Sequence, residues 1–100
     1  MFTLDHERKM GKRELRITVA DAVNELMDAD KSVLFLESDL AGASGSGKIQ
    51  KAHTEQYIQV GIAEANMMGM AAGLSAVGFK PYTHTFGPFA TRRVFDQVFL

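Results

Sequence analysis

The sequence predicts an α/β protein in which helices cover both faces of a parallel sheet. Segments with helical spacing alternate along the chain with short apolar runs, which we interpret as the order α-β-α-β-α. Alternation of this kind is typical of parallel sheets with helical crossovers. The first apolar run is continuous rather than alternating with polar residues, as expected for a parallel strand buried on both faces.

The first half of the chain contains a predicted helix, a predicted strand and a predicted loop. Residues 15–29 carry apolar side chains at helical spacing. Residues 32–36 form a short apolar run and predict a buried strand. Residues 41–48 are small and rich in glycine, which predicts a loop. Residues 1–14 are polar with basic patches and are expected to form a solvated arm.

The second half repeats the alternation. Residues 57–60 predict a second strand, and residues 63–77 predict a helix dense in Ala, Gly and Met, with Gly78 as its C-terminal cap. Residues 80–85 predict a third strand. A last helix is expected to begin near Pro88, because proline is favoured in the first turn of a helix.

The composition narrows the function classes. The chain has 100 residues, 46% of them apolar, which suits one small globular domain. A net charge of −1 argues against broad binding to nucleic acid or to acidic membranes. There is no cysteine and no apolar run of about 18 residues, so we expect a cytoplasmic protein without disulfides. The apolar end of the chain, Val94 to Leu100, predicts either the front part of a longer chain or a piece that packs against another subunit.

Glu64 is the main candidate for a functional residue. It stands where a predicted strand gives way to a predicted helix, and few residues near it in the sequence are polar. An acid without a partner in apolar surroundings costs free energy, and desolvation pushes it towards its neutral form. A first-turn acid favoured by the helix dipole is the simpler structural explanation. The functional alternative is an acid that shares a proton with a ligand.

A glycine-rich segment offers a second candidate. Residues 42–48 match the spacing G-x-x-x-x-G-K of a nucleotide-binding loop. However, Ile49 stands where a magnesium-ligating hydroxyl is expected, and residues 49–56 show no clear helical face. We therefore expect a flexible loop here rather than a nucleoside triphosphate site.

Three segments together resemble the pyrimidine-binding domain of the transketolase family of thiamine diphosphate enzymes. They are a G-I-A-E turn followed by a small-residue helix, a T-F-G-P-F strand end, and the triplet F-D-Q. With the earlier E-S-D-L, the resemblance covers residues 15–100, which we interpret as the incomplete N-terminal part of such a domain. It suggests the C-terminal subunit of a split transketolase.

The resemblance implies roles for matched residues. Glu64 would hydrogen-bond the aminopyrimidine ring nitrogen of the cofactor, and so be the catalytic residue of this chain. Phe86 and Phe89 would pack on that ring, and Asp39 would lie near the cofactor at the end of the first strand.

Four further residues are candidates for substrate binding. The resemblance suggests Arg16 as a contact to a sugar phosphate, and either Arg92 or Arg93 as a matched arginine. His84 could face a site from its strand end, and His53 could reach substrate from a polar segment. The three histidines have no metal-ligand spacing, so no metal site is expected in this chain.

The implied reaction is transfer of a two-carbon ketol unit between sugar phosphates. The resemblance implies that a partner domain or subunit holds the diphosphate and its Mg²⁺ or Ca²⁺, and that the site forms between subunits of an oligomer. Deoxyxylulose phosphate synthases and the β subunits of ketoacid dehydrogenases share the G-x-A-E turn and remain alternatives. A non-catalytic regulatory module with the same fold is another.

Overall fold

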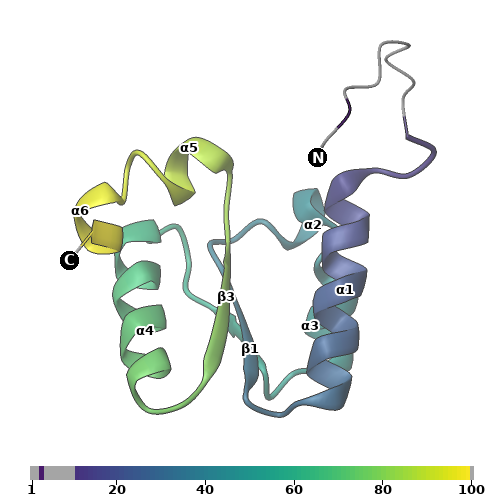
Figure 1. The fold of residues 1–100 in the computed structure, drawn as a ribbon, viewed down its shortest axis with the longest axis horizontal. Helices are drawn as coiled ribbons and strands as arrows, with labels where there is room; N and C mark the ends of the chain where they lie inside the picture. Colours follow the sequence, from purple (N-terminus) through teal and green to yellow (C-terminus); the bar gives the residue numbers. More distant parts are fainter. Residues whose placement is uncertain (1–2, 4–10, 100) are drawn as a thin grey trace.

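A three-stranded parallel sheet lies between two groups of helices in the computed structural model, which describes Thr3 and residues 11–99 (Figure 1). The strands are β1 (Val33–Glu37), β2 (Tyr57–Gln59) and β3 (Lys80–His84), in the spatial order β2-β1-β3. Both neighbours pair with β1 in parallel. The predicted parallel sheet is confirmed, with strand boundaries that differ from the predicted ones by a residue or so.

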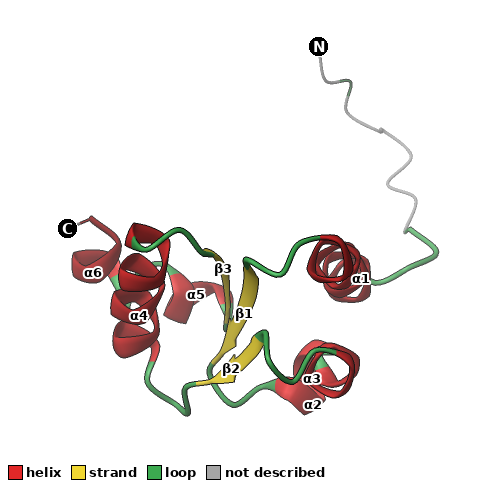
Figure 2. Cartoon of the chain, turned by 90° about the horizontal axis from the view of Figure 1, so that it is seen from below, coloured by secondary structure: helices red, strands yellow, loops and turns green. Residues whose placement is uncertain are grey.

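Helices cover both faces of this sheet, as predicted (Figure 2). On one side lie α1 (Leu15–Ala29), α2 (Ala41–Ser44) and α3 (Gly47–Ala52). On the other side lies α4 (Glu64–Ala76), with α6 (Phe95–Phe99) beside it, and α5 (Gly87–Ala90) follows the end of β3. All five residues of β1 are buried, because this central strand has a neighbour on each edge and helices on each face.

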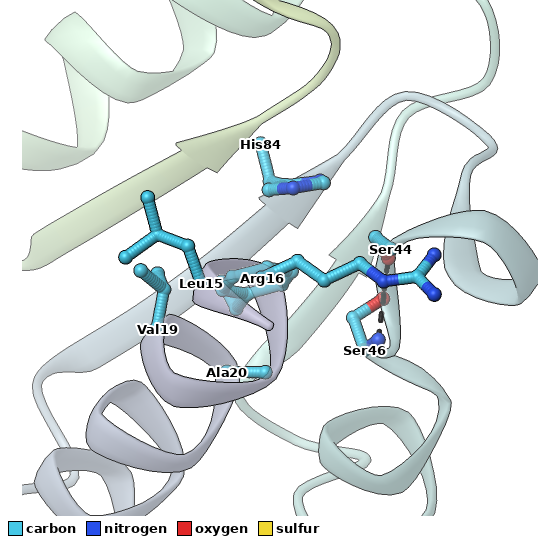
Figure 3. Close-up of a pocket in the computed structure, with 8 residues that line it drawn as sticks. Leu15, Arg16, Val19, Ala20, Ser44, Ser46 and His84 are labelled. Atoms are coloured by element: carbon cyan, nitrogen blue, oxygen red, sulfur yellow. Dashed lines mark hydrogen bonds between the residues drawn. The ribbon is translucent and has the colours of Figure 1, made fainter. Parts of the chain in front are cut away.

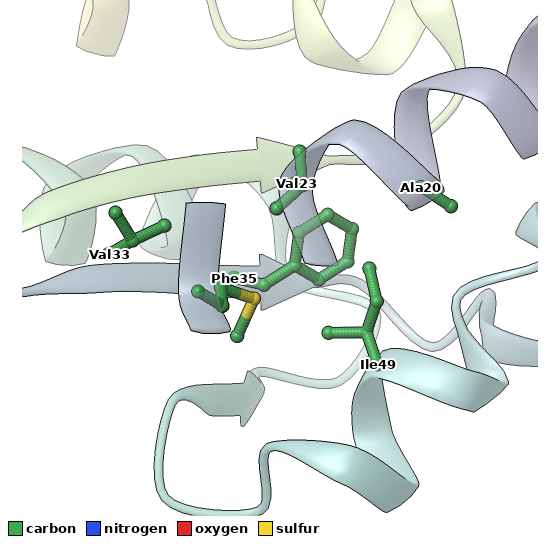
Figure 4. Packing of buried hydrophobic residues seen from close by; sticks show 6 residues of the cluster. Ala20, Val23, Val33, Phe35 and Ile49 are labelled. Carbon is green, nitrogen blue, oxygen red and sulfur yellow. The ribbon is translucent and has the colours of Figure 1, made fainter. Parts of the chain in front are cut away.

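The core on the α1 side is built around Phe35 (Figure 4). One stripe of α1, formed by Ala20, Val23 and Met27, packs there with Ile49 of α3. Three other apolar residues of the helix, Leu15, Val19 and Leu26, are exposed by 77%, 48% and 44%. The packed stripe of Ala20, Val23 and Met27 therefore lies along one edge of the apolar face of α1, and the exposed residues lie along the other.

The core on the α4 side contains Leu34, Leu36 and Met67. The end of α4 is fixed by the predicted glycine, since Gly78 has φ +99°. Its N–H donates to Ser75 O at 3.1 Å, and Phe79 N–H donates to Leu74 O at 3.0 Å. These two bonds form a Schellman motif, which lets the chain leave the helix and enter β3.

Two sequence predictions were wrong in detail. The segment 41–48 is not a plain loop, because it contains α2 and the start of α3, joined at Gly45 with φ +76°. Burial of Ile49 against the core anchors α3, a tertiary contact that the local sequence does not reveal. Lys48, the lysine of the G-x-x-x-x-G-K spacing, forms an ion pair with Asp21 of α1. The last helix is divided into α5 and α6.

Two other expectations concern the N-terminal arm and the lack of a membrane-spanning segment. The predicted arm at residues 1–14 lies mostly outside the described residues. Across the part of the chain that the structure describes, no helix has both the length and the apolar character needed to cross a membrane.

An ion pair at the amino ends of the strands predicts acid-sensitive stability. Lys80 Nζ donates to Asp30 Oδ2 at 2.7 Å, and the Ser32 hydroxyl and N–H donate to Asp30 Oδ1. The Lys80 and Ser32 hydrogen bonds hold the pKa of Asp30 well below its ordinary value of 3.8. Because this pKa is depressed in the folded state, the contribution is present above pH 3.8 and is lost as the pH falls further.

We expect Asp30→Asn to flatten the fall in stability below pH 3.8 relative to the unchanged protein. Urea midpoints measured between about pH 2 and 5 test this. Glu25→Gln, on an exposed position of α1, is the control. If the stability of the Asp30 variant falls with acid as steeply as that of the unchanged protein, this ion pair is not the source of the acid sensitivity.

Candidate functional site

The carboxyl ends of the strands surround a small pocket of about 160 Å³. Its lining includes all four residues that the sequence resemblance assigns to the cofactor: Asp39, Glu64, Phe86 and Phe89. Asp39 follows β1, Glu64 opens α4, and the two phenylalanines follow β3. In open parallel sheets, ligands bind outside the carboxyl ends of the strands, which is where these segments meet.

Glu64 is buried at the start of α4, with 6% of its surface exposed. The expectation that Glu64 has no polar partner within the chain was wrong, because Arg93 Nη1 lies 3.4 Å from each carboxylate oxygen. At 3.4 Å these are long contacts, and the Arg93 side chain is half exposed. The sequence could not show this pairing, since the residues lie 29 positions apart.

Two aromatic rings also line this pocket. The rings of Phe86 and Phe89 meet edge to face, with centroids 6.1 Å apart and an interplanar angle of 65°. The Arg93 guanidinium carbon lies 3.7 Å from the centroid of the Phe89 ring. Arg93 therefore touches both the acid and a ring of the pocket. Of the two adjacent arginines, Arg93 is the one for which the structure shows these contacts.

Two polar side chains that sequence reasoning missed fix the loops around the pocket. Gln59 Oε1 accepts hydrogen bonds from the N–H groups of Asp39 at 2.8 Å and Gly61 at 2.9 Å. Ser38 Oγ donates to Gly61 O at 2.7 Å. Asp39 has φ +59°, a left-handed conformation that favours Gly, Asn and Asp. The sequence signal that could have identified them is their position, since Ser38 directly follows β1 and Gln59 ends β2.

A second cavity, of about 320 Å³, lies on the α1 side of the sheet (Figure 3). Arg16 and His84 both line it, beside Ser44 and Ser46. Arg16 Nη1 donates to Ala43 O at 2.5 Å, and its Nε pairs with the carboxylate of Glu14. The structure thus brings together two of the four predicted substrate residues.

His53 is not part of either cavity. It follows α3 and precedes β2, so it lies at the amino ends of the strands, opposite the pocket of Glu64. Its Nε2 lies 3.1 Å from Asp28 Oδ1. The structure therefore does not bring His53 together with the other predicted site residues, and its contact with substrate stays a prediction.

Comparison with known proteins identifies the fold and the family. Residues 12–100 match the transketolase pyrimidine-binding domain. The chain belongs to the transketolase family. A 6-deoxy-6-sulfo-D-fructose transketolase subunit from Clostridium sp. (strain MSTE9) is 44% identical over 94% of this chain, which spans 29% of that relative.

Other members of the family show the same relationship. A split-gene transketolase, solved as an inactive β4 tetramer, superposes with a TM-score of 0.74 and 37% identity over 83% of this chain and 28% of its own. A 1-deoxy-D-xylulose-5-phosphate synthase from Cyanothece sp. (strain PCC 7425 / ATCC 29141) is 35% identical over 78% of this chain and 12% of its own. The chain thus spans less than a third of each of these relatives.

The residues of the pocket fit the cofactor that a transketolase-type domain implies, thiamine diphosphate. A buried carboxylate suits a ring nitrogen that carries or shares a proton, and phenyl rings suit a flat heterocycle. Within residues 11–99, no group of three or more His, Asp or Glu side chains is placed to hold a metal ion.

Proposed function

We propose that this chain supplies the aminopyrimidine-binding part of an enzyme that transfers a two-carbon ketol unit between sugar phosphates. The observation that carries the proposal is the burial of Glu64 in one pocket with Phe86 and Phe89. An acid that opens a helix for structural reasons alone has no need of this aromatic surface. A recognition site for a flat nitrogen heterocycle needs both.

Each side chain has a defined task in this proposal. Glu64 holds a proton between its carboxylate and the ring nitrogen, and its burial strengthens that hydrogen bond. Phe86 and Phe89 orient the ring through contacts worth about 0.5–1.5 kcal/mol each. Arg93 contacts the same acid and the same aromatic face, so it competes with the ring for them until the cofactor binds. Bound thiamine diphosphate supplies the carbon–carbon bond chemistry.

The remaining parts of the active site come from elsewhere. We infer that a partner domain or subunit holds the diphosphate and a divalent metal ion, Mg²⁺ or Ca²⁺, and that the site forms where the two meet. Arg16 is the candidate contact for the anionic end of the substrate, because it lines the cavity on the α1 side. The sulfosugar named for one relative makes a sulfonate a second candidate for that anionic group.

Reconstitution of the full protein with its diphosphate-binding partner tests the proposal. With thiamine diphosphate and Mg²⁺, we expect sedoheptulose phosphate to form from pentose phosphates. A second assay offers 6-deoxy-6-sulfo-D-fructose as the ketol donor, and a third offers pyruvate with glyceraldehyde phosphate. Product in the third assay alone would favour the synthase alternative. Cofactor binding without turnover in any assay would favour the regulatory alternative and contradict ketol transfer.

A further inference from the structure

Glu37 is a fully buried acid outside the pocket of Glu64. It ends β1 and is 0% exposed. Its Oε1 lies 2.8 Å from Ser44 Oγ and 2.7 Å from Ser46 Oγ, and its Oε2 accepts a hydrogen bond from the Tyr57 hydroxyl. Desolvation and this bond raise the pKa of Tyr57 above its ordinary value of 10.0. Contacts from the junction of α2 and α3 and from β2 hold this acid in one orientation.

His84 stands directly beside this acid. The parallel pairing of β1 and β3 places Glu37 and His84 in register, so both side chains lie on the α1 face of the sheet. His84 Nδ1 lies 3.6 Å from Glu37 Oε1, and the imidazole stacks on Phe35 with centroids 5.8 Å apart and an interplanar angle of 23°. Among the described residues, Nδ1 is buried without a hydrogen-bond partner.

The hydroxyl protons of the cluster leave one acceptor position on the Glu37 carboxylate unused. Ser44 Oγ lies 2.7 Å from Ser46 Oγ, so Ser44 can donate to Ser46 while Ser46 donates to Glu37. Each hydroxyl has one proton, and each carboxylate oxygen has two acceptor positions. This arrangement leaves one position on Oε1 for an N–H at His84 Nδ1. A shift of a few tenths of an ångström closes the 3.6 Å separation to a hydrogen bond.

We propose that Glu37 and His84 form a carboxylate–histidine pair in which Glu37 positions the imidazole, and His84 Nε2 accepts a hydrogen bond from a hydroxyl of the sugar substrate. His84 lines the 320 Å³ cavity with Arg16, whereas Glu37 is not among its lining residues (Figure 3). An Nδ1–H bound to the carboxylate leaves Nε2 as an acceptor, the usual effect of such a partner on a histidine. Glu37 is a positioning residue in this scheme.

The identity of the ligand rests on the proposed function, but the tautomer of His84 does not. Nitrogen-15 NMR of the imidazoles, in the full chain at a pH where they are neutral, therefore tests the pair without an activity measurement. We expect the Nδ1–H form for His84, with His→Gln variants of the three histidines assigning the signals. An Nε2–H form in the unchanged protein would overturn the pair.

Kinetics of the reconstituted enzyme test the contact to substrate. We expect His84→Gln to lower kcat/KM by about 10–100-fold, mostly through KM, and Glu37→Gln to lower it by a similar factor. The double variant should be no worse than His84→Gln alone, because Glu37 acts through His84. The proposed contact would be overturned if the losses of kcat/KM from the two single variants added in the double variant. It would also be overturned if KM were unchanged in His84→Gln. If Glu37→Gln fails to fold, the NMR result and His84→Gln still decide.

Discussion

Glu64→Gln is expected to lower turnover of the reconstituted enzyme by at least about 100-fold while the fold remains intact. A positioned group that holds a proton in the reaction contributes about 10²–10⁴-fold. Glutamine keeps the shape of the side chain and one oxygen acceptor, but it cannot exchange a proton with a ring nitrogen. Steady-state kinetics at saturating thiamine diphosphate measure the loss, and circular dichroism checks the fold.

The control for this substitution is Glu55→Gln, which removes an exposed carboxylate between α3 and β2. This position lies at the amino ends of the strands, away from the pocket, so the control should keep its activity. A second measurement separates binding from turnover, because the Glu64 variant should also bind the cofactor more weakly in calorimetry. Turnover within a few-fold of the unchanged enzyme would remove the proton-sharing mechanism.

The parallel sheet could be predicted because its signal is local. A continuous apolar run such as β1 indicates burial on both faces, and all five of its residues are buried. The end of α4 could also be predicted from the sequence, because Gly78 supplies the positive φ that a Schellman motif needs. Short helices are different, since too few residues contribute to define a face. The position of α3 depends on burial of Ile49 beneath α1.

The candidate site was only partly visible in the sequence. Glu64 and the two phenylalanines stand out through the family resemblance, and the structure gathers them in one pocket. The contact between Arg93 and Glu64 joins positions 29 residues apart, so no local pattern reveals it. Glu37 was missed as a candidate because an acid at the end of an apolar run looks like the boundary of a strand. The register of β1 with β3 places it beside His84.

Leu36→Ala is expected to lower the free energy of unfolding by about 2–5 kcal/mol. Leu36 is 0% exposed and packs with Leu34 and with Met67 of α4. Alanine removes three carbons from this contact, and the cavity can collapse only partly because strands on both sides hold the β1 backbone. Urea unfolding followed by circular dichroism measures the difference from the shift in midpoint.

The matched control is Leu26→Ala, which makes the same chemical change on α1 at a position that is 44% exposed. Its cost should stay below about 1 kcal/mol, because much less apolar surface leaves water there on folding. The contrast between the two leucines tests whether α4 is packed on β1, and hence whether Glu64 at the start of α4 is held in place. If both variants lose the same free energy of unfolding, α4 is not packed on β1 as described. The placement of the pocket at the start of α4 would then be contradicted as well.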